Sequence, residues 1–130
     1  MLNVPEQLRF AKTHEWVALS GNTATIGITE FAVKLLSDLV FIDLPKVGKA
    51  VVAGEPFGEI ESVKHVSDLY APVSGKVVAV NAELVDKLEW LAQEPYGMAW
   101  MIKVEVSDAS ALAGLLDAAA YTAHCEAENH

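Results

Sequence analysis

The chain has 130 residues, of which 52% are hydrophobic, and its formal net charge is −9. This size and composition predict a single folded domain, residues 1–130, that buries a core rather than a disordered chain. The acidic balance argues against nucleic acid and anionic membrane surfaces as partners, and no apolar run approaches the roughly 20 residues of a membrane span.

The single cysteine and the first residues indicate a cellular compartment. Cys125 has no partner for an internal disulfide, which is typical of a protein kept in a reducing compartment. Residues 1–9 carry no basic segment followed by an apolar run, so neither a signal peptide nor a transit peptide is expected. We therefore expect a bacterial-type cytoplasmic location, although a mature organellar protein would show the same pattern.

The N-terminal part predicts a hairpin followed by a short helix. Residues 15–19 and 23–28 are strand candidates, and the alternation in the second strand gives it one wet and one dry face. Thr29 is a plausible N-cap, and the apolar spacing after it predicts a helix that ends near Ser37.

The middle of the chain reads as short strands separated by turns. A strand over 40–44 should stop at Pro45, and a second short strand is expected over 49–52. Pro56 is expected at the edge or start of a strand. Residues 76–80 form a β-branched run that indicates a buried strand.

The C-terminal part predicts one more strand and a helix. Residues 82–97 are irregular, with a helical turn expected around 88–92, and apolar residues alternate over 98–106 as in a strand. Asp108 could cap a last helix, and 124–130 are expected to fray. The core is expected to span about residues 8–121, and the apolar face of the last helix is expected to comprise Leu112, Leu115, Leu116, Ala119 and Ala123.

Several short strands with turn signals, and helices only at the margins, indicate a mainly β, antiparallel sandwich or barrel. Residues 59–75 hold a lysine, Lys64, between two of these strand-like flanks. The turn has no Asn-Gly or Asp-Gly pair, so a type I turn with Val63 and Lys64 at its tip is expected. A lysine there has its ammonium in water, which suits a side chain that another enzyme must modify.

The sequence around this lysine resembles a known family. Glu61-Ser62-Val63-Lys64 and the following 67–75 closely resemble the lipoylation site of the glycine cleavage system H proteins. Glycines sixteen and ten residues before Lys64, and eleven after it, fall at spacings usual for lipoyl domains. The resemblance runs from about residue 8 to about residue 121. It implies a flattened antiparallel barrel-sandwich hybrid of the lipoyl/biotinyl type, with a short helix on the N-terminal side and a C-terminal helix.

The resemblance also implies a function. Lys64 would carry lipoic acid through an amide bond, as N6-lipoyllysine, and the chain would be a carrier rather than an enzyme. Its partners would be the glycine decarboxylase (P protein), the aminomethyltransferase (T protein), the dihydrolipoamide dehydrogenase (L protein) and the lipoyl-attaching enzymes. The carrier would take the aminomethyl group of glycine from the P protein to the T protein, and electrons to the L protein.

Two acidic residues match positions that lie beside the loaded arm in this family. The resemblance implies that Glu15 and Asp68 could hold the protonated amine of the aminomethyl group through charge-assisted hydrogen bonds. Alternatively, Glu15 is an exposed strand residue, and Asp68 is a cap of the turn that precedes it.

Two other carrier functions are alternatives for a protein with this lysine. Biotin carriers usually flank their lysine with methionines, whereas Val63 and His65 stand here, and a biotinyl carrier stays an alternative. A relay protein that hands lipoyl groups to other complexes would share the same lysine. The four histidines lack zinc-ligand spacing with Cys125, so no metal site is expected. Leu88 and the segment 97–100 depart from the pattern of the family, which leaves partner contacts there open.

Overall fold

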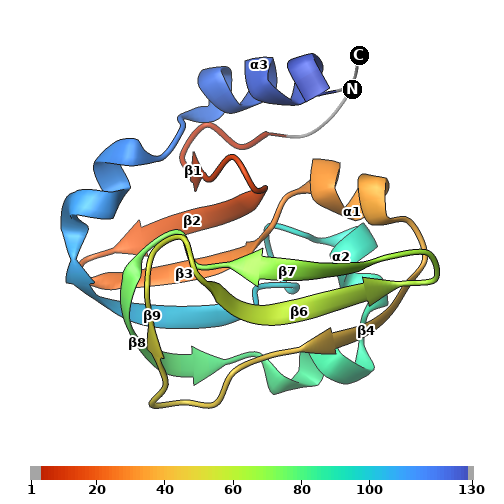
Figure 1. Ribbon diagram of the computed structural model, residues 1–130, viewed down its shortest axis with the longest axis horizontal. Helices are drawn as coiled ribbons and strands as arrows, with labels where there is room; N and C mark the ends of the chain where they lie inside the picture. The colour runs from red at the N-terminus through yellow and green to blue at the C-terminus, as the bar shows by residue number, and fades with distance from the viewer. Residues whose placement is uncertain (1–3, 129–130) are drawn as a thin grey trace.

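The computed structural model describes residues 4–128, and it arranges them in two antiparallel sheets (Figure 1). The larger sheet has the order β1-β2-β3-β9-β8-β5 and the smaller one β4-β6-β7. This confirms the predicted mainly β, antiparallel class. The strands are β1 (Arg9–Phe10), β2 (Glu15–Ser20), β3 (Thr23–Ile28), β4 (Leu39–Asp43), β5 (Ala50–Val51), β6 (Pro56–Ser62), β7 (Val66–Tyr70), β8 (Ser74–Val80) and β9 (Ile102–Asp108).

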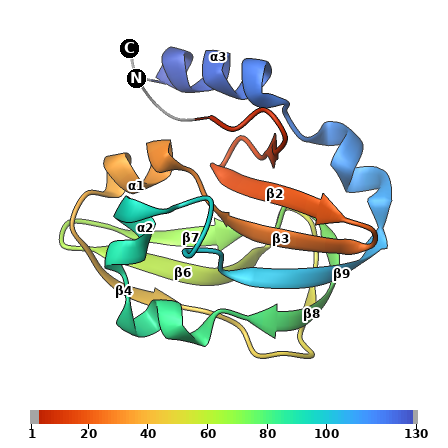
Figure 2. The ribbon, with the colours of Figure 1, turned by 180° about the vertical axis from the view of Figure 1, so that it is seen from behind.

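Helices are short and lie at the margins of the sheets. In Figures 1 and 2, α1 and α2 lie together at one end of the sheets, whereas α3 lies beside β1 and the start of β2. None of the helices within residues 4–128 is long and apolar enough to cross a membrane. The helices are α1 (Glu30–Leu36), α2 (Glu89–Gln93) and α3 (Ala118–Glu128), with 3₁₀ turns η1 (Ala82–Asp86) and η2 (Ala109–Gly114).

Local sequence rules account for the first half of the fold. In β3, Ala24 and Ile26 are fully buried while Thr23 and Thr25 are only partly covered, as alternation predicts. The Ala32 N–H donates to Thr29 Oγ1 at 3.3 Å, which confirms Thr29 as the N-cap of α1. β6 begins at Pro56, where the missing N–H costs no ladder hydrogen bond.

The core consists of two apolar clusters. The main one fills the space between the sheets, and residues such as Ile26, Ile42, Ile60 and Val104 are almost completely buried there. The second cluster, which we call the α3 cluster, lies between α3, β1, β2 and α1. It contains Leu8, Phe10, Trp16, Phe31, Tyr121 and Cys125.

The strand predicted over 98–106 begins four residues late. β9 starts at Ile102, and before it Met98 is 47% exposed while Ala99 and Met101 are fully buried. The Asn81 side-chain amide donates to the Met98 and Trp100 carbonyls, both at 2.8 Å. These bonds occupy carbonyls that a strand would use in its ladder, so the segment forms turns instead.

The last helix also begins later than predicted. The Ala120 N–H donates to Asp117 Oδ1 at 2.8 Å, so Asp117 caps α3. Asp108, the predicted cap, ends β9, and its side chain lies outside the described residues. The predicted apolar face is wrong at Ala119 and Ala123, which are exposed.

The tail predicted to fray over 124–130 is instead helical as far as the structure describes it. Helix α3 continues to Glu128, and residues 129–130 lie outside the described part. Tyr121 and Cys125, one turn apart, pack into the α3 cluster and hold this helix on the larger sheet. The prediction failed because Cys125 anchors the segment.

Candidate functional site

Lys64 lies at the tip of the hairpin formed by β6 and β7. The last paired residues are Glu61 and Val66, so Val63 and Lys64 form the tip, as predicted. The Lys64 side chain is exposed, and within residues 4–128 it makes no ion pair. The amine is therefore available to another molecule.

The backbone beneath this amine is held at three points. The Ser62 N–H donates to the His65 carbonyl at 2.8 Å, and the His65 N–H donates to Ser62 Oγ at 3.1 Å. A serine hydroxyl thus closes the turn in place of the carbonyl bond of the predicted type I turn. The Val63 N–H donates to the Asp38 carbonyl at 2.9 Å, which ties the tip to the connection between α1 and β4.

Apolar side chains surround the hairpin tip on the outer face of the smaller sheet. Phe41 pairs with Glu61, and Glu61 pairs with Val66, so the three form one row across β4, β6 and β7. Phe41 is 49% exposed, and Val63 and Val66 are exposed even further. The lysine is thus presented beside a surface that a protein partner could cover.

Glu15 begins β2, and its carboxyl group is buried between the two sheets, with 1% of the residue exposed. Thr13 Oγ1 donates to Glu15 Oε1, and the Tyr70 N–H donates to Oε2 at 3.1 Å. β7 is an edge strand of the smaller sheet, and Glu15, which belongs to the larger sheet, accepts a hydrogen bond from a backbone N–H of this edge. The alternative of an exposed strand residue is therefore wrong.

Burial also changes the chemistry of this carboxyl group. It raises the pKa of Glu15 from 4.5 to about 7, although the hydrogen bonds from Thr13 and Tyr70 act in the opposite direction. Near neutral pH the group is therefore divided between its protonated and ionised forms. A cation placed beside it would favour the ionised form.

Asp68 lies on β7, two residues before Tyr70, and unlike Glu15 it is exposed. It is exposed within the strand and pairs with Glu59, which pairs with Asp43, so three carboxylates share one cross-strand row. The turn-cap alternative is wrong, because Asp68 is inside a strand. It precedes Tyr70 by two residues, or roughly 7 Å along the strand.

A surface hollow of about 500 Å³ adjoins the buried carboxyl group. Thr13 and Tyr70, which both hydrogen-bond Glu15, line it together with Gly54, Pro72 and Leu115. Along β7, Tyr70 lies about 20 Å from Lys64. A long group attached to Lys64 would have to fold back along β7 to reach this hollow.

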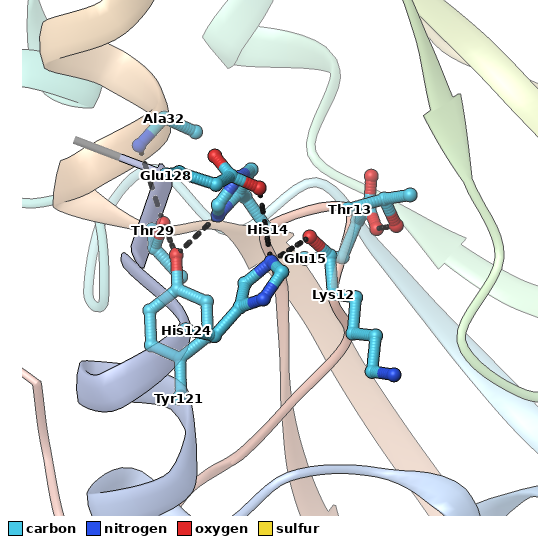
Figure 3. A network of polar contacts seen from close by, with 9 residues as sticks. All are labelled: Lys12, Thr13, His14, Glu15, Thr29, Ala32, Tyr121, His124 and Glu128. Atoms are coloured by element: carbon cyan, nitrogen blue, oxygen red, sulfur yellow. Dashed lines mark hydrogen bonds and ion pairs between the residues drawn. The ribbon is translucent and has the colours of Figure 1, made fainter. Parts of the chain in front are cut away.

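A second group of polar residues was missed by the sequence analysis. His14, His124 and Glu128 come together between the start of β2 and the end of α3 (Figure 3). The only sequence signal is that His124 and Glu128 are four residues apart and share one face of a helix. His14 lies 110 residues before His124, and only the fold joins them.

Comparisons with known proteins match nearly the whole chain. A family model described as glycine cleavage H-protein matches residues 8–128. A glycine cleavage system H protein of Anoxybacillus flavithermus is 54% identical over 120 residues, which cover 92% of this chain and 94% of the relative. One from Bacillus cereus strain AH187 is 56% identical over the same shares.

A solved structure has the same fold. The crystal structure of a glycine cleavage system H protein from Mycobacterium marinum matches with a TM-score of 0.85 and 40% sequence identity. The match covers 92% of this chain and 97% of that one.

Proposed function

This chain belongs to the glycine cleavage H-protein family, the lipoyl carriers of the glycine cleavage system, and we propose that Lys64 bears the lipoyl group. The observation that carries the proposal is an exposed amine, with no ion pair to any of the described residues, on a backbone held at three points. An attaching enzyme needs a free amine to form an amide with the carboxyl group of lipoate. It also needs that amine in a reproducible position, which the bonds of Ser62 and Val63 supply.

The lipoyl group would supply the chemistry, and this chain would supply its position. The lipoyl group would provide a redox-active disulfide able to carry an aminomethyl group. The P protein would load this group from glycine with release of carbon dioxide, the T protein would pass the one-carbon unit to tetrahydrofolate with release of ammonia, and the L protein would restore the disulfide using NAD. Each of these reactions belongs to a partner enzyme. We therefore propose a carrier without a catalytic role of its own.

Glu15 and Asp68 are proposed to receive the charged amine that the loaded arm carries. The hollow beside Thr13 and Tyr70 offers an entry next to the buried Glu15 carboxyl group, and Asp68 lies on the way from Lys64 along β7. An ammonium group there would draw Glu15 into its ionised form, because opposite charges offset the effect of burial. Such an attraction would keep the loaded arm folded back and would slow the release of the aminomethyl group to water.

The compartment is proposed to be the cytoplasm of a bacterium. The relatives of Anoxybacillus and Bacillus are bacterial proteins, and the single Cys125 is a buried free thiol, as fits a reducing compartment.

A reconstituted reaction tests the carrier function. Purified P, T and L proteins are mixed with glycine, tetrahydrofolate and NAD, and NADH formation is followed with the lipoylated chain, with the unlipoylated chain and with Lys64→Arg. We expect NADH only with the lipoylated wild-type chain, since arginine keeps the charge but offers no amine to acylate.

Two results would contradict parts of this proposal. Equal NADH formation with Lys64→Arg would show that Lys64 is not the residue that bears the lipoyl group. A fully lipoylated chain that supports no NADH formation, but transfers its lipoyl group to another carrier protein, would favour the relay function instead.

A further inference from the structure

His14, His124 and Glu128 form a compact group of metal-ligating atoms that the carrier function does not use. The Nε2 atoms of the two histidines lie 3.0 and 2.9 Å from the two oxygens of Glu128, and all three ligand groups fall within 4.8 Å of one another (Figure 3). Two imidazole nitrogens and one carboxylate are a common ligand set for zinc. We propose that these three residues bind a divalent first-row transition metal ion of the zinc class.

The outer nitrogen of His14 already has the partner that metal-bound histidines require. His14 Nδ1 lies 2.7 Å from the Tyr121 hydroxyl, which lies 2.6 Å from Thr29 Oγ1. His14 Nε2 now lies 3.0 Å from Glu128 Oε2. With an ion bound, Nδ1 would donate to Tyr121 and Tyr121 to Thr29, so the lone pair of Nε2 would face the ion. This chain of hydrogen bonds orients the ring for a metal ion.

The backbone also fixes the position of His14. Its φ angle is 79°, in the left-handed region that a non-glycine residue adopts at a cost. The His14 N–H donates to the Ala11 carbonyl at 2.9 Å, and the Thr29 N–H donates to the His14 carbonyl at 3.0 Å. A costly conformation held by bonds on both sides keeps the imidazole facing α3.

The site is open to ions from solution. The side chains of His14, His124 and Glu128 are 12%, 25% and 39% exposed. Cys125, next to His124 in the chain, is buried and does not belong to this group of ligand atoms.

Closing around an ion requires the ligand atoms to adjust. Ligand atoms about 2 Å from a tetrahedral zinc ion lie about 3.3 Å apart. The present spacing between Glu128 and each histidine is close to this value, whereas the group as a whole spans up to 4.8 Å and would have to contract. The Lys12 carbonyl, 3.0 Å from His124 Nε2, faces the same point. Zinc would displace the proton that His124 Nε2 now shares, and water would take a remaining position.

A bound ion would have a structural consequence. His14 belongs to the connection between β1 and β2, whereas His124 and Glu128 belong to the last turns of α3. An ion bound to all three would therefore fasten the C-terminal helix to the larger sheet. Ligands that bind only the native state stabilise it, so zinc should raise the melting temperature.

The test is a zinc titration of the untagged, full-length chain after removal of metals by EDTA. Calorimetry with Zn²⁺ alone is performed on the wild type and in a Lys64→Arg background, which excludes binding by lipoyl sulfurs. Absorption after Co²⁺ addition reports the ligand geometry. We expect one ion per chain in both backgrounds and a higher melting temperature with zinc than with EDTA.

Variants assign the ligands. His124→Gln and Glu128→Gln should each weaken zinc binding by about tenfold or more, and Tyr121→Phe, which keeps the ring, should weaken it by about ten- to a hundredfold through His14. The matched control is His65→Gln, an exposed histidine outside the group, which should bind as the wild type does. Absence of one-to-one binding, or unchanged affinity in folded His124→Gln and Glu128→Gln, would overturn the proposal. The three residues would then form only hydrogen bonds between α3 and the start of β2.

Discussion

The hairpin tip and the α3 cluster differ in whether their polar side chains have partners within the protein. At the tip, Ser62 and Val63 fix the backbone by hydrogen bonds, while the Lys64 amine forms no ion pair within the described part of the chain. Beside the α3 cluster, His14 and Tyr121 instead have partners on their polar side-chain atoms. The first region offers a group to other molecules, and the second one stabilises the fold.

This contrast follows from what each region buries. The tip rests on few apolar contacts, since Val63 is 69% exposed, so its rigidity comes from hydrogen bonds and the neighbouring Asp38 carbonyl. The α3 cluster stacks the rings of Phe10 and Tyr121 with centroids 4.6 Å apart and buries both completely. Stability should therefore depend on the cluster, and modification should depend on the tip.

The largest effect on stability is expected for Phe10→Ala. Removing a fully buried ring that stacks on Tyr121 should lower the free energy of unfolding by about 3–5 kcal/mol. Urea denaturation measures it. The matched change at the tip, Val63→Ala, should cost less than about 0.5 kcal/mol. Similar losses for the two variants would contradict the division between the regions.

Glu15 should make stability depend on pH. Its pKa is about 7 in the folded chain and about 4.5 when unfolded, so between these values the native state binds more protons than the unfolded state. Stability therefore falls as pH rises through this window, by about 3 kcal/mol for this group. Glu15→Gln should flatten the dependence measured by urea denaturation between pH 4.5 and 8. An unchanged slope in the variant would show that burial does not control this carboxyl group.

A smaller effect is expected for Ser62→Ala at the hairpin turn. The variant loses the hydroxyl that accepts the His65 N–H, which should cost about 1 kcal/mol. Lipoyl attachment to Lys64 should become several-fold slower, because a looser turn presents the amine less reproducibly. Initial rates of attachment, followed by mass spectrometry, measure this effect. Equal rates for Ser62→Ala and wild type would mean that the hairpin turn need not be rigid.

Local patterns in the sequence predicted much of the fold. Alternation located β3, Thr29 was correctly expected to cap α1, and Pro56 begins β6. The alternation over 98–101 was misleading, because the Asn81 side chain, seventeen and nineteen residues away from its partners, binds the carbonyls there. The end of α3 was also mispredicted, since Cys125 is buried in a cluster that includes Leu8 and Phe10, which are distant in sequence.

The residues of the candidate site also differ in whether the local sequence could predict them. Lys64 could be predicted because its motif is contiguous and the flanking strands are local. The burial of Glu15 could not be predicted, because it depends on Tyr70 in the other sheet. The group formed by His14, His124 and Glu128 lies beyond local reasoning for the same reason, since it unites the two ends of the chain.

Intact-mass measurement tests the central claim most directly. The purified wild-type chain and Lys64→Ala are each incubated with lipoate, ATP and a lipoate-attaching enzyme, and both are weighed by mass spectrometry. We predict one added lipoyl group on the wild type and none on Lys64→Ala. A lipoyl group that is still added to Lys64→Ala would contradict the assignment of Lys64 as the attachment site.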